Sequence, residues 1–106
     1  MAETGVLLVL CTFPSREEAC QIGTLLVEKQ LAACVNVSAD LLSIYRWKGK
    51  VCQETEVQGL FKVAESRFEE FASALRERHP YEMPDILALP VVEGDPAYLA
   101  WVQKGG

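Results

Sequence analysis

The first third of the chain combines one apolar run with one stretch of helical spacing. Val6–Cys11 is an unbroken apolar run, which is typical of a central β-strand buried on both faces. Ser15 stands three residues before Glu18, the spacing of a capping box, and this pair predicts the start of a helix. Apolar residues then recur at helical spacing, at Ala19, Ile22, Leu25 and Leu26. We therefore expect a strand and then a helix that runs to about Gln30.

The middle of the chain has the pattern of a long β-hairpin. We expect an extended stretch from Cys34 to about Trp47, and then a tight turn in which Gly49 supplies a positive φ. Beyond the turn the chain alternates between a polar face and an apolar face, the latter formed by Val57, Gly59, Phe61 and Val63. Two paired strands of about ten residues or more each are longer than a small domain. The far end of such a hairpin therefore needs another surface to pack against. This length indicates oligomerisation.

A second helix and a stiff loop follow the hairpin. Ser66 and Glu69 predict another capping box, and apolar residues recur behind them at Phe68, Phe71, Ala72 and Leu75. The helix must stop before Pro80, since a residue that precedes proline disfavours helical backbone angles. Two prolines then make residues 79–84 an extended, stiffened loop.

The chain closes with one more strand and one more helix. Ile86–Leu89 is a short apolar run closed by Pro90, which predicts a strand. Asp95 suits an N-cap and Pro96 the first helical position, so a short C-terminal helix should begin there.

This order of elements predicts a single α+β domain over residues 1–106. A β-α-β-β-α-β series with right-handed crossovers gives a ferredoxin-like split β-α-β sheet, with a long hairpin and a short C-terminal helix added. Both main helices then cover one sheet face. The other face has no covering layer within the chain, so it either carries polar residues or packs on a partner.

Charge and composition exclude some classes of partner. The 106 residues carry a formal net charge of −5, which argues against nucleic-acid binding and against adsorption to anionic lipid. The apolar run at the N-terminus is too short for a signal peptide or a membrane span. We therefore expect a cytoplasmic protein whose four cysteines are thiols.

Residues that support chemistry are few. The glycines are scattered, so no phosphate-binding loop is present. Any pair of a nucleophile and a histidine would have to use the single histidine, His79. Cys11 at the end of the first strand and His79 at the end of the second helix are expected at one sheet edge, where they meet either within a chain or across an interface. A thiolate with an imidazole suits Cu(I) or zinc, and Glu82 or a second chain would have to complete such a site. The simpler alternatives are a helix C-cap for His79 and a buried apolar role for Cys11.

Two sets of side chains on the hairpin each have two interpretations. Trp47 beside a Lys-Gly-Lys turn either folds back or anchors in a neighbouring subunit, and we favour the neighbour. Glu54, Glu56 and Lys62 share the polar side of the strand that follows the turn. These three side chains form an ion-pair network or line a pocket between subunits, and the ion-pair network is the favoured interpretation.

Several motifs, spread over nearly the whole chain, resemble the CutA divalent-ion tolerance family. They are Leu31-Ala-Ala-Cys-Val-Asn-Val37, Ser43-Ile-Tyr-Arg-Trp-Lys-Gly-Lys50, Glu54 to Lys62, His79-Pro-Tyr-Glu-Met-Pro-Asp-Ile86, Leu89-Pro-Val91 and Tyr98-Leu-x-Trp101. The resemblance implies a cytoplasmic homotrimer of ferredoxin-like domains, similar to PII-type signalling proteins. It implies a role in tolerance of copper and other divalent ions, and no known catalytic reaction.

The resemblance also implies site residues. The family's copper ligands correspond here to Cys11 and His79, but Arg78 occupies the position of a further histidine, and a guanidinium cannot ligate a metal. An inter-subunit pocket is implied more fully, by Trp47, Glu56, Lys62, His79, Tyr81 and Trp101.

Our leading hypothesis is a trimeric, non-enzymatic protein that binds copper or another divalent cation weakly, with Cys11, His79 and Glu82 as ligands. The alternative is a PII-like signalling module that binds a small anionic ligand or a protein partner at the subunit interface. In that case Lys62 or Arg78 would contact the anion. A structural trimer that serves a partner protein is a third possibility.

Overall fold

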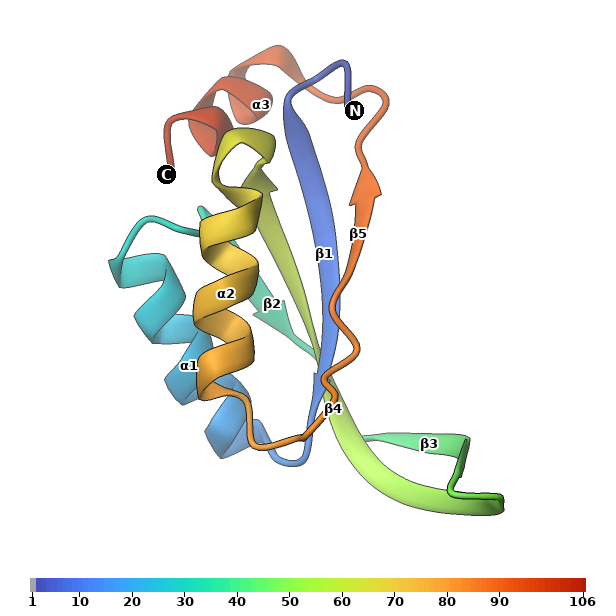
Figure 1. Ribbon diagram of the computed structural model, residues 1–106. Coiled ribbons are helices and arrows are strands. Elements are labelled where there is room, and N and C mark those ends of the chain that lie inside the picture. The colour runs from blue at the N-terminus through green and yellow to red at the C-terminus, as the bar shows by residue number, and fades with distance from the viewer. Residues whose placement is uncertain (1) are drawn as a thin grey trace.

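The computed structural model describes residues 2–106 and contains three α-helices, one short 3-10 helix and five strands (Figure 1). The strands are β1 (Val6–Phe13), β2 (Cys34–Val37), β3 (Leu41–Trp47), β4 (Lys50–Ala64) and β5 (Leu87–Pro90). The helices are α1 (Arg16–Glu28), the 3-10 segment η1 (Glu65–Arg67), α2 (Phe68–Arg78) and α3 (Pro96–Gln103).

The sheet has the predicted ferredoxin-like topology. Its strand order is β2-β4-β1-β5, with antiparallel neighbours throughout, and β3 pairs with the far part of β4. Helices α1 and α2 lie on one face of this sheet, while β3 and the first part of β4 project from the body as a hairpin arm (Figure 1). We use the name arm for residues 41–56, the part of the chain in which β3 pairs with β4.

Local capping explains where two of the helices begin. The Ser15 hydroxyl accepts a hydrogen bond from the Glu18 amide at 3.2 Å, as the sequence predicted. A carboxylate oxygen of Asp95 accepts one from the Tyr98 amide at 3.1 Å, and Pro96 is the first residue of α3. Both acceptors satisfy backbone donors that the first helical turn leaves unpaired.

The predicted capping box at Ser66 and Glu69 is wrong. Ser66 lies inside the 3-10 turn of η1, and α2 begins only after it, with Arg67 at the N-cap position and no side-chain cap. Since the 3-10 turn already supplies the helical entry, the Ser66 hydroxyl is not needed as an acceptor there.

The extended stretch predicted from Cys34 to Trp47 is interrupted. Strand β2 ends at Val37 and β3 begins at Leu41, and the Ser38 hydroxyl between them accepts a hydrogen bond from the Gln58 amide at 2.7 Å. This side-chain contact replaces a backbone ladder bond, so the pairing with β4 breaks and the arm departs from the body.

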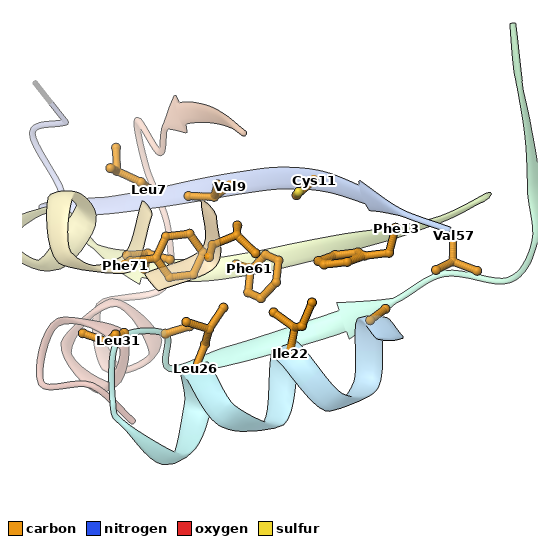
Figure 2. Packing of buried hydrophobic residues seen from close by; sticks show 14 of the residues in the cluster. Leu7, Val9, Cys11, Phe13, Ile22, Leu26, Leu31, Val57, Phe61 and Phe71 are labelled. Atoms are coloured by element: carbon orange, nitrogen blue, oxygen red, sulfur yellow. The ribbon is translucent and has the colours of Figure 1, made fainter. Parts of the chain in front are cut away.

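The core lies between the sheet and the two main helices. Its largest fully buried side chains include Phe13, Phe61, Phe71, Leu26 and Leu75. The ring of Phe61 packs edge-on against Phe71, with centroids 5.1 Å apart. Figure 2 shows Ile22 and Leu26 of α1 pointing toward Phe61 on β4.

Strand β1 is buried on both faces only at its start, where Val6 packs with Val102 of α3, and on one face beyond it, in contrast to the prediction of two buried faces. Leu7, Val9, Cys11 and Phe13 point into the core. The alternating residues Leu8, Leu10 and Thr12 are half-buried, because α1 and α2 cover only the opposite face. Beyond the cluster of Val6 and Val102, the second face of the sheet is open in the single subunit.

Candidate functional site: an acidic hollow beside the arm

A hollow of about 620 Å³ lies between the arm, the end of β1 and the loop that follows α2. Its lining combines aromatic, carboxylate and smaller side chains: Thr12, Ser43, Tyr45, Arg46, Trp47, Glu54, Glu56, Pro80, Tyr81, Glu82, Met83 and Asp85. Four carboxylates face a single guanidinium there. This imbalance favours a cation over the anionic ligand of the alternative hypothesis.

The arm presents its polar face to the hollow because of strand periodicity. Glu54 and Glu56 are two residues apart on β4, so their side chains lie on the same face. Ser43 and Tyr45 of β3 pair with Glu54 and Cys52 of β4 and share that face. Leu42 and Ile44 alternate with them and point away from the hollow.

Glu56 and Tyr81 connect the arm to the loop. Glu56 is only 7% exposed, and the Tyr81 hydroxyl donates a hydrogen bond to its carboxylate. Burial and this hydrogen bond to Glu56 raise the pKa of Tyr81, so the phenol stays a neutral donor. A buried carboxylate thus has a fixed partner that holds the loop against the arm.

Glu54 and Tyr45 form a similar pair nearer the tip of the arm. The Tyr45 hydroxyl donates to a Glu54 carboxylate oxygen at 2.7 Å. The hydrogen bond to Glu54 raises the pKa of Tyr45 to about 12. Both glutamates therefore accept from a tyrosine through one oxygen.

Asp85 anchors the far end of the loop to β1. One carboxylate oxygen of Asp85 accepts hydrogen bonds from the Thr12 amide at 2.8 Å and from the Thr12 hydroxyl at 3.0 Å. The loop is therefore fixed at Tyr81 and at Asp85, and the residues between these two points, including Glu82 and Met83, form one wall of the hollow.

His79 occupies the C-cap position of α2, and its buried side chain links the loop to β1. One ring nitrogen, Nε2, lies 2.8 Å from the Thr12 carbonyl oxygen, and the other, Nδ1, accepts from the Tyr81 amide at 3.1 Å. Because Nδ1 accepts, Nε2 must carry the hydrogen that is donated to Thr12. The ring also stacks on Phe13, with centroids 4.9 Å apart. Both ring nitrogens are thus engaged within the subunit.

Cys11 lies in the core, directly before Thr12. Its sulfur is 3.7 Å from the same Thr12 carbonyl oxygen that His79 contacts. Burial, together with the negative charges of Asp85 and Glu56, raises the pKa of the Cys11 thiol. The thiol form is therefore favoured over the thiolate that binds metals.

The predicted metal ligands are brought near one another without forming a complete site. Cys11 and His79 both contact Thr12, and Glu82 lines the hollow beyond them. Among residues 2–106, no three histidine, cysteine, aspartate or glutamate side chains are grouped so that they could hold a metal ion. The metal site remains a prediction.

The predicted inter-subunit pocket residues divide into two groups. Trp47, Glu56 and Tyr81 line the hollow together. Lys62 is six residues from Glu56 on β4, about 20 Å away along an extended strand, and it donates to the Asn36 side chain. Trp101 packs on Tyr98 of α3, and Arg78 ends α2 with an exposed side chain.

The polar side chains of β4 are held by hydrogen bonds to uncharged partners, and not by the ion-pair network that the sequence favoured. Glu54 and Glu56 accept hydrogen bonds from tyrosines, and Lys62 donates to an asparagine. All three partners are uncharged side chains. The side chains of Glu54 and Glu56 line the hollow within the subunit, and Lys62 does not, so a pocket between subunits stays a prediction.

Sequence reasoning missed Tyr45, Arg46, Met83 and Asp85 as lining residues. A signal was available for Tyr45, because a hairpin centred on Gly49 places it near Glu54 on one face. No local signal existed for Asp85, whose contact with Thr12 joins residues 73 positions apart.

The comparisons with known proteins agree over almost the whole chain. The family model of the CutA1 divalent ion tolerance protein matches residues 7–105. The divalent-cation tolerance protein CutA of Thermus thermophilus is 43% identical over 97 residues, which cover 92% of this chain and 94% of that protein. A solved structure of the divalent cation tolerance protein from Thermus thermophilus has a TM-score of 0.92 at 42% identity, and covers 94% of this chain and 97% of that one.

Other relatives differ in length or in description. Mouse protein CutA is 42% identical over 88% of this chain, which spans only 52% of the mouse protein's length. A solved structure from Archaeoglobus fulgidus, described as a periplasmic divalent cation tolerance protein CutA, has a TM-score of 0.90 at 34% identity and covers 94% of this chain and 97% of that one.

The matched segment contains every structural part of the hollow. The match to residues 7–105 includes the arm, the end of β1 and the loop after α2. Within residues 2–106, no helix is long and apolar enough to cross a membrane. With this length of match and this identity to the Thermus thermophilus protein, the chain belongs to the CutA1 divalent ion tolerance family.

Proposed function

We propose that the protein is a homotrimer that binds copper or another divalent cation weakly and catalyses no reaction. Its role in the cell is tolerance of metal ions, the role named in its relatives' descriptions. We place it in the cytoplasm, a reducing compartment that suits its four free thiols.

The convergence of Cys11 and His79 on one carbonyl oxygen carries the metal proposal. A thiol and an imidazole held at a common point supply a soft and a borderline donor, which together favour Cu(I). Binding requires loss of the thiol proton, and His79 must release the Tyr81 amide or Thr12. These costs explain why the proposed affinity is weak.

The exposed apolar side chains of the arm support the trimer. Leu42, Ile44 and Val51 are 61%, 63% and 65% exposed, although an isolated hairpin gains nothing from apolar residues on its outer face. On the body, Leu87 and Leu89 of β5 are exposed as well. A second copy of the chain that covers these residues would remove them from water.

A competitive Cu(I) titration under reductant tests the metal proposal. The wild type should bind Cu(I), and Cys11→Ala and His79→Ala should each weaken binding about tenfold or more, about 1.4 kcal/mol. Cys20→Ala is the matched control, because Cys20 is an exposed thiol on α1 and should leave the affinity unchanged. Circular dichroism establishes that each variant is folded.

Two results would contradict the metal proposal. The first is equal Cu(I) binding by the wild type and by both site variants. The second is an absence of binding by the wild type itself. Light scattering on the same samples tests the assembly, and the mass of a single subunit at micromolar concentration would overturn the trimer independently of the metal.

A further inference from the structure

The hollow contains more aromatic surface than binding of a bare metal ion requires. Tyr45, Trp47 and Tyr81 line it together with four carboxylates. A hydrated or dehydrated divalent ion interacts with oxygen ligands and gains little from aromatic rings. Aromatic faces combined with carboxylates instead match an organic ammonium group, which interacts with both.

We propose that the hollow binds a linear organic diamine or polyamine, with its ammonium groups on Glu54 and Glu56 and its aliphatic chain against the aromatic side chains. This site is separate from Cys11 and His79, so it does not depend on the metal proposal.

The two glutamates are held ready for such a ligand. Glu54 and Glu56 each accept a tyrosine hydroxyl through one carboxylate oxygen. Among residues 2–106, the second oxygen of each glutamate accepts no further hydrogen bond. Orientation by the tyrosines lowers the entropy that ordering these side chains would cost on binding.

The strand sets the spacing of the two carboxylates. Glu54 and Glu56 are two positions apart on one face of β4, which places their Cα atoms about 7 Å apart. Two ammonium groups joined by a short aliphatic chain span a distance of this order, so each ammonium group can face one of the two carboxylates. This spacing favours a diamine over a monoamine.

The aromatic wall can accept a cation, as the chain itself illustrates. The Lys48 ammonium group lies 5.9 Å from the centroid of the Trp47 ring, within the range of a cation–π contact. Arg46 is the one cationic side chain in the lining, and its guanidinium donates to the Gly49 carbonyl oxygen at 3.5 Å. It is thus directed toward the turn at the tip of the arm, away from Glu56.

Isothermal titration calorimetry with putrescine tests the proposal on the full chain at low salt. We expect one diamine per subunit, and about tenfold or greater weakening for Glu54→Gln. Glu54 is exposed, so this change keeps the fold. The matched control is Glu93→Gln, which removes an exposed carboxylate outside the hollow and should change the affinity less than about twofold.

Butylamine tests whether binding needs two amines, and Mg²⁺ tests whether the hollow prefers an organic cation to a metal ion. Butylamine has the same chain with one amine and should bind at least about tenfold more weakly, while Trp47→Leu should weaken putrescine binding severalfold. Lack of putrescine binding at millimolar concentration would overturn the proposal. So would equal affinity of Glu54→Gln and the wild type, or displacement of putrescine by equimolar Mg²⁺. Because Cys11→Ala leaves this site intact, failure here is distinct from failure of the Cu(I) titration.

Discussion

The two halves of β4 are one continuous strand in two different environments. From Val57 onward its alternating side chains are buried in the core, and Phe61 and Val63 are fully inaccessible. Before Glu56 almost every residue is exposed, including Val51. The body half is held by strands on both sides and by helices, whereas the arm half pairs only with β3. The same strand thus changes from a core element to an element that needs an external partner.

The largest expected effect follows from a charge on the outer face of the arm. Ile44→Asp places a carboxylate where the proposed trimer buries an apolar side chain, and we expect the assembly to dissociate into single subunits. Light scattering measures this as a loss of mass. Ser73→Asp adds a charge to an exposed position of α2 and should leave the mass unchanged. If Ile44→Asp keeps the wild-type mass, the arm is not the interface.

A cavity in the body should cost stability that a change on the arm does not. Phe61→Ala removes a fully buried ring and should lower the free energy of unfolding by about 3–5 kcal/mol. Gln53→Ala on the arm should change it by less than about 0.5 kcal/mol. Urea unfolding at one fixed protein concentration measures both, since dissociation makes the midpoint concentration-dependent. Similar losses in both variants would remove the contrast between body and arm.

Amide hydrogen exchange sharpens the comparison along β4 itself. In the dissociated Ile44→Asp variant, the amides of residues 51–55 should exchange about a hundredfold faster than those of residues 59–63, because the arm opens without unfolding the body. In the assembled wild type this difference should shrink. Uniform protection along β4 in the variant would mean that the arm is stable alone.

The smallest effect concerns a tyrosine on the arm. Tyr45 should ionise near its raised pKa of about 12 rather than at its ordinary 10.0. The folded state favours the neutral phenol, so this contribution to stability is present below pH 10 and is lost as the pH rises through 12. Glu54→Gln should return the pKa toward its ordinary value, as followed by NMR titration of the phenol carbon. An unchanged pKa in that variant would show that Glu54 is not the cause.

Most of the fold could be predicted because its signals are local. The Ser15 cap, the Asp95 cap and the alternation from Val57 to Val63 each involve residues within a few positions of one another. The break at Ser38 could not be predicted, because it depends on a hydrogen bond to Gln58 on another strand. The 3-10 entry to α2 was missed for a related reason, since a capping spacing does not show which helical turn forms first.

The candidate site was predicted less completely than the fold. Glu56 and Tyr81 were named, and the structure brings them together across 25 positions of sequence. Tyr45 was missed although the hairpin register places it near Glu54, whereas Asp85 depends on how the loop folds back onto Thr12, which periodicity does not report. The separation of Lys62 from Glu56 was readable from strand geometry, since six residues of an extended chain cannot share one small pocket.

The continuity of β4 limits how the chain can change in length. Glu56 faces the hollow and Val57 faces the core, and both are buried although they are neighbours. One residue inserted between them would leave the body in register and turn every side chain of the arm to the opposite face. Leu42 and Ile44 would then face the hollow, and Glu54 would face outward. An insertion of two residues would restore both faces, so length changes at this junction should be tolerated in pairs.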